Sequence, residues 1–381
     1  MGFRTTISYL LWPLTMWYAV GVAVRNFFYS VGLKKQEAPH ITTIGVGNLC
    51  TGGSGKTPHV EYLLRLLSHN HRVAMLSRVY KRKSKGFVLD DGSHDAIQLG
   101  DEAAMIAAKY PDVQVAVCEK RIDGVKRLMS LELEGKSPEP DDDNAALTPD
   151  TERESSPEVI VLDDVFQHRA IKPSINILLT EYRHPYFRDH ILPFGNLREF
   201  RTARYRATMV IVTKCPAVLN PVEKHNIIHD LKLQNYQKVF FSYLKYGDLR
   251  SMDGHDAGID LRHMDRVLVV TGIAHPEPMV EELRRSCKVQ HMAFPDHHAY
   301  NKRDMDRIRE AFGALQGQRK VIVTTEKDAV RLRGLTEGLP FYVLPIEVAF
   351  HKESDKDFDQ IIGSSVRENI SFLSKLSIWN H

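Results

Sequence analysis

Short runs of aliphatic and β-branched residues alternate with stretches in which apolar positions recur at helical spacing. Apolar runs of about five residues, bounded by polar turns, are typical of strands buried on both faces of a sheet. Their alternation with helices predicts an α/β fold with a doubly wound, mostly parallel sheet. The first series predicts strands at residues 41–46, 73–77, 113–118, 159–162, 175–179 and 209–213.

A second series of apolar runs follows a more polar stretch around residues 220–237. It predicts strands at residues 239–243, 267–271, 289–294, 321–325 and 341–344. Because 381 residues exceed what one hydrophobic core usually serves, we expect a second, smaller α/β domain. The expected divisions are an N-terminal helix at 1–35, a larger domain at 36–225, the smaller domain at 226–350 and a helical segment at 351–381, whose domain membership stays open.

The N-terminal segment, residues 5–24, has no charged side chain. It is long enough to span a bilayer, but Pro13 and several polar residues dilute its apolar character. Trp12, Trp17 and Tyr18 are side chains that favour the headgroup region. We therefore expect a membrane-associating helix that lies in the interface, and a buried core helix is the other interpretation.

Composition narrows the possible partners and the compartment. The formal net charge of +3 is too small to indicate nucleic acid. The four cysteines lie far apart without Cys-x-x-Cys pairing, which indicates neither a disulfide framework nor a zinc site and favours a reducing environment. Residues 137–158 hold four prolines and many acidic side chains, a composition that predicts a disordered surface insertion.

Residues 50–57, Cys-Thr-Gly-Gly-Ser-Gly-Lys-Thr, stand between the first predicted strand and a helix expected to begin near His59. A phosphate-binding loop occupies this place, since consecutive glycines let backbone N–H groups turn toward an anion. The strict pattern has glycine where this chain has Cys50, so the match is to the Gly-Gly-x-Gly-Lys-Thr variety. A glycine turn that only caps a helix is the other interpretation. The predicted ATP-binding residues are Gly52, Gly53, Ser54, Gly55, Lys56 and Thr57.

The strand predicted at 159–162 ends in Asp163 and Asp164. In a phosphate-loop fold, a carboxylate at the end of a neighbouring strand binds Mg²⁺ directly or through water. By itself an Asp-Asp pair is as often a solvated turn, but the glycine loop upstream favours the metal. The predicted magnesium ligands are therefore Thr57, Asp163 and Asp164.

Further phrases follow in a fixed order along the chain. They are Val-Gly-Asn-Leu at 46–49, Ser-Arg-Val-Tyr at 77–80, Gly-Asp-Glu at 100–102, Asp-Asp-Val-Phe-Gln-His-Arg at 163–169, Phe-Gly-Asn-Leu-Arg-Glu at 194–199, Pro-Asp-His-His at 295–298 and Thr-Glu-Lys-Asp at 325–328. With the glycine loop, this ordered set resembles the tetraacyldisaccharide 4′-kinase (lipid A 4′-kinase) family of Gram-negative bacteria over nearly the whole chain.

The resemblance implies ATP-dependent phosphorylation of the 4′-hydroxyl of a tetraacylated glucosamine disaccharide 1-phosphate, with Mg²⁺. It places the protein at the cytoplasmic face of the inner membrane, as a peripheral or monotopic protein. The implied partners are the membrane-embedded glycolipid and, through the N-terminal helix, inner-membrane lipids. No nucleic acid and no obligate protein partner are expected.

The resemblance also implies an acid–base pair. Asp101 is the expected general base, because the family places a catalytic carboxylate in the Gly-Asp-Glu phrase. Read from the residues alone, Asp101 is more often a helix cap for residues 102–109. A carboxylate is a weak base for an alcohol, so an imidazole that shares the proton would help. The resemblance implies His297 in this role, with His298 as the close alternative.

Basic and polar side chains complete the predicted site. Arg78 opens a basic stretch at 78–85 that either holds a substrate phosphate or forms a solvated loop. The resemblance implies that Arg121 acts as a catalytic cation near the γ-phosphate. The expected substrate-binding residues are Arg78, Gln167, His168 and Arg198.

Several positions depart from the family pattern. Val79 and Val165 stand where the family usually has glycine, Lys81 replaces a frequent second glycine, and Ala103 replaces a common proline. A β-branched residue rarely adopts positive φ, so we expect these turns to take another shape. The rival class is a membrane-tethered P-loop ATPase that acts as a switch or partitioning protein. Such proteins share the glycine loop but add a lysine where this chain has Thr51, and they leave the Asp-His-His phrase unexplained.

Overall fold

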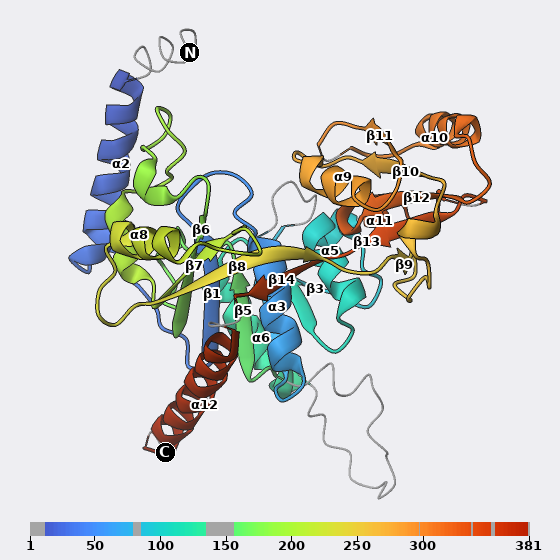
Figure 1. Ribbon diagram of the computed structural model, residues 1–381. Coiled ribbons are helices and arrows are strands. Elements are labelled where there is room, and N and C mark those ends of the chain that lie inside the picture. The colour runs from blue at the N-terminus through green and yellow to red at the C-terminus, as the bar shows by residue number, and fades with distance from the viewer. Residues whose placement is uncertain are drawn as a thin grey trace, which may run out of the picture. The chain divides into compact units, whose positions relative to one another are not determined.

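The computed structural model describes residues 12–78, 85–134, 156–296, 298–336, 338–351 and 355–379 (Figure 1). The chain forms two compact units. Unit 1 comprises Met1–Ser93, Tyr110–Leu244 and Val348–His381, and unit 2 comprises His94–Lys109 and Lys245–Glu347. Each unit is built around a mostly parallel sheet, which confirms the predicted α/β fold. Residues 1–11 and 135–155, which hold the start of the predicted N-terminal helix and most of the predicted insertion, lie outside the described residues.

The sheet of unit 1 has the strand order β14-β8-β7-β6-β1-β5-β2-β4-β3. The pairs from β8 to β4 are parallel, and β3 lies antiparallel to β4. Strands β1, β2, β5 and β7 are buried along their whole length, as the apolar runs predict. The strands are β1 Thr42–Asn48, β2 Val73–Ser77, β3 Val88–Leu89, β4 Gln114–Val117, β5 Val159–Asp163, β6 Ile175–Glu181, β7 Met209–Thr213, β8 Lys238–Tyr246 and β14 Ile346–Phe350.

Helices pack on this sheet through two apolar clusters. Leu128 of α6 joins Leu76 of β2 in one cluster, and Leu231 of α8 joins Phe241 of β8 in the other. Helix α3 packs on β1, β2 and β5, and α12 packs on β1. The helices of unit 1 are α2 Trp12–Ser30, α3 Lys56–Ser68, α6 Arg121–Glu134, α8 Pro221–Leu231 and α12 Asp355–Trp379, with short 3₁₀ turns η1 Tyr186–Arg188 and η2 Arg201–Arg206.

Strand β8 belongs to the sheet of unit 1, whereas the sequence placed residues 239–243 in the second domain. Phe240 is buried against Phe350 of β14 and Phe358 of α12, with ring centroids 6.3 and 5.0 Å away. This aromatic contact ties the C-terminal segment to β8, so α12 lies in unit 1. The domain boundary expected at residue 226 falls inside α8.

Unit 2 has a sheet with the strand order β11-β10-β12-β13-β9, parallel except for β9. Helix α5 comes from the first third of the chain but packs on α11 of this unit. The strands are β9 Arg250–Ser251, β10 Arg266–Thr271, β11 Val289–Ala293, β12 Lys320–Thr325 and β13 Phe341–Leu344. The helices are α4 Ala96–Leu99, α5 Asp101–Lys109, η3 Leu261–His263, α9 Glu277–Arg284, α10 Lys302–Ala314 and α11 Glu326–Leu332.

A buried carboxylate anchors α2 to the body of unit 1. Glu199, whose side chain is fully buried, accepts hydrogen bonds from Arg25 of α2 at 2.9 Å and from Arg206 at 2.8 Å. Tyr18 of α2 donates its hydroxyl to the carbonyl of Arg198 at 3.0 Å. Arg25 and Glu199 lie 174 residues apart in the sequence, so no local pattern indicates this pair.

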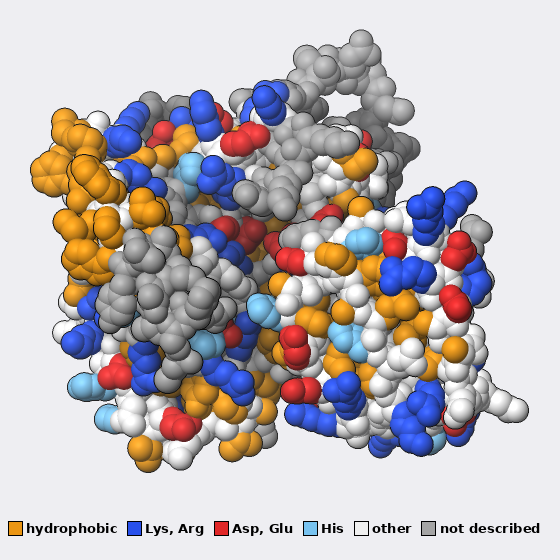
Figure 2. Space-filling model, turned by 90° about the horizontal axis from the view of Figure 1, so that it is seen from above, with side chains coloured by type: hydrophobic (Ala, Val, Ile, Leu, Met, Phe, Trp, Pro, Cys, Tyr) orange, Lys and Arg blue, Asp and Glu red, His pale blue; other side chains and the backbone are white. Residues whose placement is uncertain are grey.

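The rest of α2 exposes apolar side chains. Trp17 is 77% exposed and Leu14 is 58% exposed, and Figure 2 shows hydrophobic side chains gathered over this helix. In the described part of the chain, no helix is both long and apolar enough to cross a membrane.

The Glu199 contact yields a stability prediction. We expect Glu199→Ala to lower the free energy of unfolding by about 3 kcal/mol, because it leaves two arginines without their buried partner. Asp230→Ala, which removes an exposed pair with Arg188, is the control and is expected to cost less than about 1 kcal/mol. Urea unfolding followed by circular dichroism measures both. Equal losses in the two variants would contradict the anchoring role.

Candidate functional site

The predicted phosphate loop lies between β1 and α3, as the sequence indicated. Gly52 and Gly55 adopt φ of +110° and +82°, a region that favours glycine. The loop is tied to the sheet through Ser54, whose hydroxyl accepts a hydrogen bond from Asn48 at 2.8 Å. Its carbonyl accepts another from the Thr213 hydroxyl at 2.9 Å. The ends of β1 and β7 therefore hold the loop in place.

A buried histidine contacts the end of the loop, a role that the sequence did not reveal. His59 Nδ1 lies 2.7 Å from the Gly55 carbonyl oxygen, and its Nε2 lies 2.9 Å from the Ser242 hydroxyl. Since a carbonyl only accepts, Nδ1 donates and Nε2 accepts. Burial lowers the pKa of His59 to about 4, so the imidazole is neutral at pH 7. The partner Ser242 comes from β8, which no local pattern near His59 could indicate.

The predicted carboxylates lie beside the loop. Because β1 and β5 are parallel neighbours, with Val46 opposite Asp163, their carboxyl ends meet at one edge of the sheet. Asp163 is buried and accepts a hydrogen bond from Ser77 at 3.1 Å. Asp164 lies 3.6 Å from the Lys56 ammonium and 3.3 Å from the Arg198 guanidinium. The structure thus brings Lys56, Asp164 and Arg198 together.

The turn at Asp164 explains how Val165 is tolerated. The left-handed residue is Asp164, with φ of +46°, whereas Val165 does not adopt positive φ. Val165 is buried, and its Cγ1 is the atom that a Cβ on Gly45 of β1 would meet at 2.7 Å. The close packing of this loop on β1 therefore requires glycine at 45 rather than at 165. Val79, the other valine where the family usually has glycine, lies outside the described residues.

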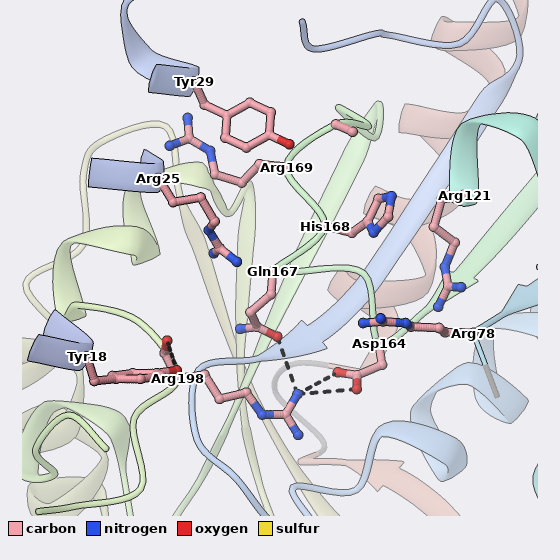
Figure 3. Close-up of a pocket in the computed structure, with 11 residues that line it drawn as sticks. Tyr18, Arg25, Tyr29, Arg78, Arg121, Asp164, Gln167, His168, Arg169 and Arg198 are labelled. Carbon is pink, nitrogen blue, oxygen red and sulfur yellow. Dashed lines mark hydrogen bonds and ion pairs between the residues drawn. The ribbon is translucent and has the colours of Figure 1, made fainter. Parts of the chain in front are cut away.

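An arginine-lined cavity of about 380 Å³ adjoins this group (Figure 3). Tyr18, Arg25 and Tyr29 enter it from α2, and Asp164 lines it from the loop after β5. The excess of guanidinium groups over carboxylates makes it a site for an anion. Its other lining side chains are Arg78, Arg121, Gln167, His168, Arg169 and Arg198, and Ala170 also borders it.

Burial lowers the pKa of three side chains of this basic cavity, His168, Arg121 and Arg169. Burial, with Arg121, Arg78 and Arg25 nearby, lowers the pKa of His168 to about 4, so this imidazole is neutral at pH 7. Burial lowers the pKa of Arg121 to about 10, a value at which it stays charged. Arg121 donates to the carbonyls of Cys118 at 2.8 Å and Asp163 at 2.7 Å, so it also fixes the end of β5.

Polar contacts orient the remaining predicted residues of unit 1. Gln167 donates to the Asn48 carbonyl at 2.7 Å, and its side-chain oxygen lies 3.4 Å from Arg198 Nη1. Arg198 therefore touches both Asp164 and Gln167 (Figure 3). These contacts connect the end of β1, the loop after β5 and the Leu-Arg-Glu phrase.

The predicted acid–base residues belong to unit 2. Asp101 is the first residue of α5, after Gly100 at φ of +83°, and its Oδ2 binds the guanidinium of Arg331. His298 donates through Nε2 to Asp304 at 2.9 Å. His297, the predicted partner of Asp101, lies outside the described residues. Sequence reasoning missed Arg331, which stands three residues after the Thr-Glu-Lys-Asp phrase.

A glycine loop between a buried parallel strand and a helix, beside a strand that ends in paired carboxylates, defines a P-loop nucleotide-binding protein. The family model of the tetraacyldisaccharide-1-P 4′-kinases matches residues 7–366 of the chain. The chain belongs to this family, as its ordered motifs predicted.

Relatives of the family cover almost the entire chain. A tetraacyldisaccharide 4′-kinase of Bacteroides fragilis (strain YCH46) is 40% identical over 371 residues, 94% of this chain and 93% of its own length. The protein of that name from Flavobacterium johnsoniae is 38% identical over 362 residues, 95% and 98% of the two chains. A crystal structure described as the "apo" form of LpxK from Aquifex aeolicus in complex with ATP is 28% identical. It has a TM-score of 0.71 and covers 94% of this chain and 99% of its own.

The buried imidazole of His59 predicts a pH dependence of stability. Its folded pKa of about 4 lies below the ordinary value of 6.5, so the unfolded chain binds more protons between these values. The contribution of His59 to the free energy of unfolding is therefore fully present above pH 6.5. It is lost as the pH drops toward 4, which lowers the free energy of unfolding by up to about 3 kcal/mol. Urea unfolding at several pH values should show a smaller fall for His59→Asn than for the unchanged protein. Parallel curves would exclude this role.

Proposed function

We propose that this chain transfers the γ-phosphoryl group of ATP to the 4′-hydroxyl of a tetraacylated disaccharide 1-phosphate. The observation that carries the proposal is the strand–glycine loop–helix unit, with Lys56 beside Asp164, a residue that lines the arginine-rich cavity. The relatives with this activity in their name align over more than nine tenths of their length.

ATP would lie with its phosphates on the loop at residues 52–57. Backbone N–H groups at the start of α3 favour negative charge, and Lys56 neutralises the β- and γ-phosphates. A solved relative is described as a complex with ATP, which supports this ligand. The nucleotide is the donor of the transferred group, so Lys56 is expected to act most strongly as charge develops during transfer.

Mg²⁺ fits the oxygen donors next to the loop. Thr57 offers a hydroxyl, and Asp163 and Asp164 offer carboxylates at the end of β5. Hard cations take such oxygen ligands, with phosphate oxygens and water completing the shell. Among the described residues, no group of three or more His, Cys, Asp or Glu side chains is placed to hold a metal alone. The ion would neutralise phosphate charge when bound with ATP.

The transfer needs a base for the acceptor alcohol. In the proposed step the 4′-oxygen bonds to the γ-phosphorus, the bond from that phosphorus to the β–γ bridging oxygen breaks, and ADP leaves. The hydroxyl proton passes to the carboxylate of Asp101, with His297 as the proposed partner that shares it. Arg121 is the proposed cation near the transferred group, where a guanidinium stabilises the developing charge.

The arginine-lined cavity is the proposed site for the phosphate that the sugar already carries. Arg78 and Arg198 supply charge, and Gln167 and neutral His168 supply hydrogen bonds. Because α2 lines the same cavity and exposes Trp17 and Leu14, we propose that α2 lies in the cytoplasmic face of the inner membrane. The proposed partners are therefore the glycolipid and the surrounding lipids.

Transfer of labelled γ-phosphate from ATP to tetraacyldisaccharide 1-phosphate in detergent micelles tests the proposal. We expect transfer by the unchanged protein and a loss of at least about 100-fold in kcat for Lys56→Ala and for Asp101→Ala. Lys288→Ala, at an exposed lysine of unit 2, is the control. A folded protein that binds ATP without transferring phosphate would instead favour the membrane-tethered ATPase.

A further inference from the structure

Ion pairs join α5 to α11 within unit 2. Arg331 binds Asp101, Lys327 binds Glu102, and Lys109 binds Glu326 at 2.6 Å. The pair with Asp101 differs from the others in the burial of its cation. The Arg331 side chain is 7% exposed and that of Asp101 28% exposed, whereas the lysines of the other two pairs are 18% and 33% exposed. An exposed pair contributes little to stability, so the buried guanidinium calls for a separate explanation.

Two nitrogens of Arg331 converge on one oxygen of Asp101. Nε lies 2.9 Å and Nη2 lies 2.7 Å from Oδ2. Because the guanidinium is planar and rigid, two bonds to one oxygen fix the position of Oδ2 relative to Arg331. A lysine at this position would supply charge without this geometry.

The third nitrogen of the Arg331 guanidinium holds the arginine itself in place. Its Nη1 donates to Asp328 Oδ1 at 3.2 Å and to the Gly272 carbonyl at 3.1 Å. Asp328 is fully buried, and its Oδ2 accepts from the Gly272 N–H at 2.9 Å and from the Thr325 hydroxyl at 2.8 Å. The guanidinium is therefore fixed to the ends of β10 and β12, which are neighbouring strands of a rigid sheet.

The backbone at Gly272 is closely packed. A Cβ there would meet Asp328 Oδ1 at 3.0 Å and Tyr300 Oη at 3.1 Å. A side chain at 272 would therefore displace Asp328 or Tyr300 by a few tenths of an ångström. The chain of contacts from the strand ends through Asp328 and Arg331 to Asp101 leaves little freedom at any step.

We propose that Arg331 is the positioning residue for the Asp101 carboxylate and that Asp328 is its brace. The inference rests on the proposed function, in which Asp101 accepts the proton of the acceptor alcohol. A base works only within hydrogen-bond reach of that proton, and a displacement of about 1 Å costs about 100-fold in rate. Arg331 provides that precision by joining Asp101 to the sheet.

Steady-state kinetics of three variants test this role. Arg331→Met is expected to lower kcat about 100-fold and to leave the KM for ATP within about twofold, because ATP binds at residues 52–57. Arg331→Lys keeps the charge opposite buried Asp328 and is expected to fold and to recover only part of kcat. Lys327→Met removes the neighbouring pair between the same helices and is the matched control, expected to keep kcat within about twofold.

Non-additivity separates positioning from a general loss of structure. In an Asp101→Asn background, Arg331→Met is expected to cause no further loss of kcat, because its effect passes through Asp101. Losses that multiply, or an equal loss in Lys327→Met, would overturn the proposal. If Asp101→Asn keeps full activity, the base assignment fails, and a large loss in Arg331→Met would then overturn the positioning role as well.

A crystal structure tests, without an activity measurement, whether Arg331 positions the Asp101 side chain. In a crystal structure of the Arg331→Lys variant, the Asp101 side chain is expected to leave its present rotamer or to occupy several. An unchanged, ordered Asp101 would overturn the proposal even if the protein transferred no phosphate. Absence of transfer by the unchanged protein, together with a displaced Asp101 in the variant, would count against the proposed function and support the positioning contact.

Discussion

The parallel pairing of β1 with β5 is the constraint on which the nucleotide site depends. It sets Val46 opposite Asp163, so the chain leaves both strands at the same edge of the sheet. The glycine loop and the paired carboxylates are more than 100 residues apart in sequence, yet this register alone makes them neighbours. Gly45 and Gly47 then let the loop after β5 pack directly on β1, since a Cβ at Gly47 would meet Phe166 at 2.6 Å.

Buried arginines and carboxylates fix the surrounding loops. Arg121 holds the carbonyl of Asp163, Glu199 holds Arg25 and Arg206, and Asp328 holds Arg331. The contacts of Arg121 with Asp163 and of Arg25 with Glu199 join segments 42 and 174 residues apart, whereas Asp328 is only three residues from Arg331. Each buried charge meets polar partners within hydrogen-bond distance, as burial requires. The guanidinium groups that line the cavity repel one another, and in a mobile structure this repulsion would push them apart. Fixed partners keep these groups in place and leave their charge directed at an incoming anion.

The local features of the site were predictable, and the long-range ones were not. The glycine loop, the six strands of the first predicted series and the Asp163-Asp164 pair follow from short patterns, because strand ends and glycine turns are encoded by adjacent residues. The membership of β8 and α5, the anchor at Glu199 and the Arg331 contact each depend on a partner far away in sequence. In the turn that holds Val165, the left-handed residue is Asp164, a residue type that adopts positive φ more readily than valine.

Helix α2 has one side suited to each of the two chemically different parts of the proposed substrate. One side of it carries exposed apolar side chains such as Trp17, which suit acyl chains and headgroups. Another side carries Arg25 and Tyr29 into the basic cavity, where a sugar phosphate fits. Glu199 links these two properties, because the carboxylate that holds the helix in place is the same one that orients Arg25. In the proposed function the acyl chains of the substrate stay in the bilayer, so its phosphate can reach only a cavity held at that depth. A helix anchored by its own arginine would meet both conditions.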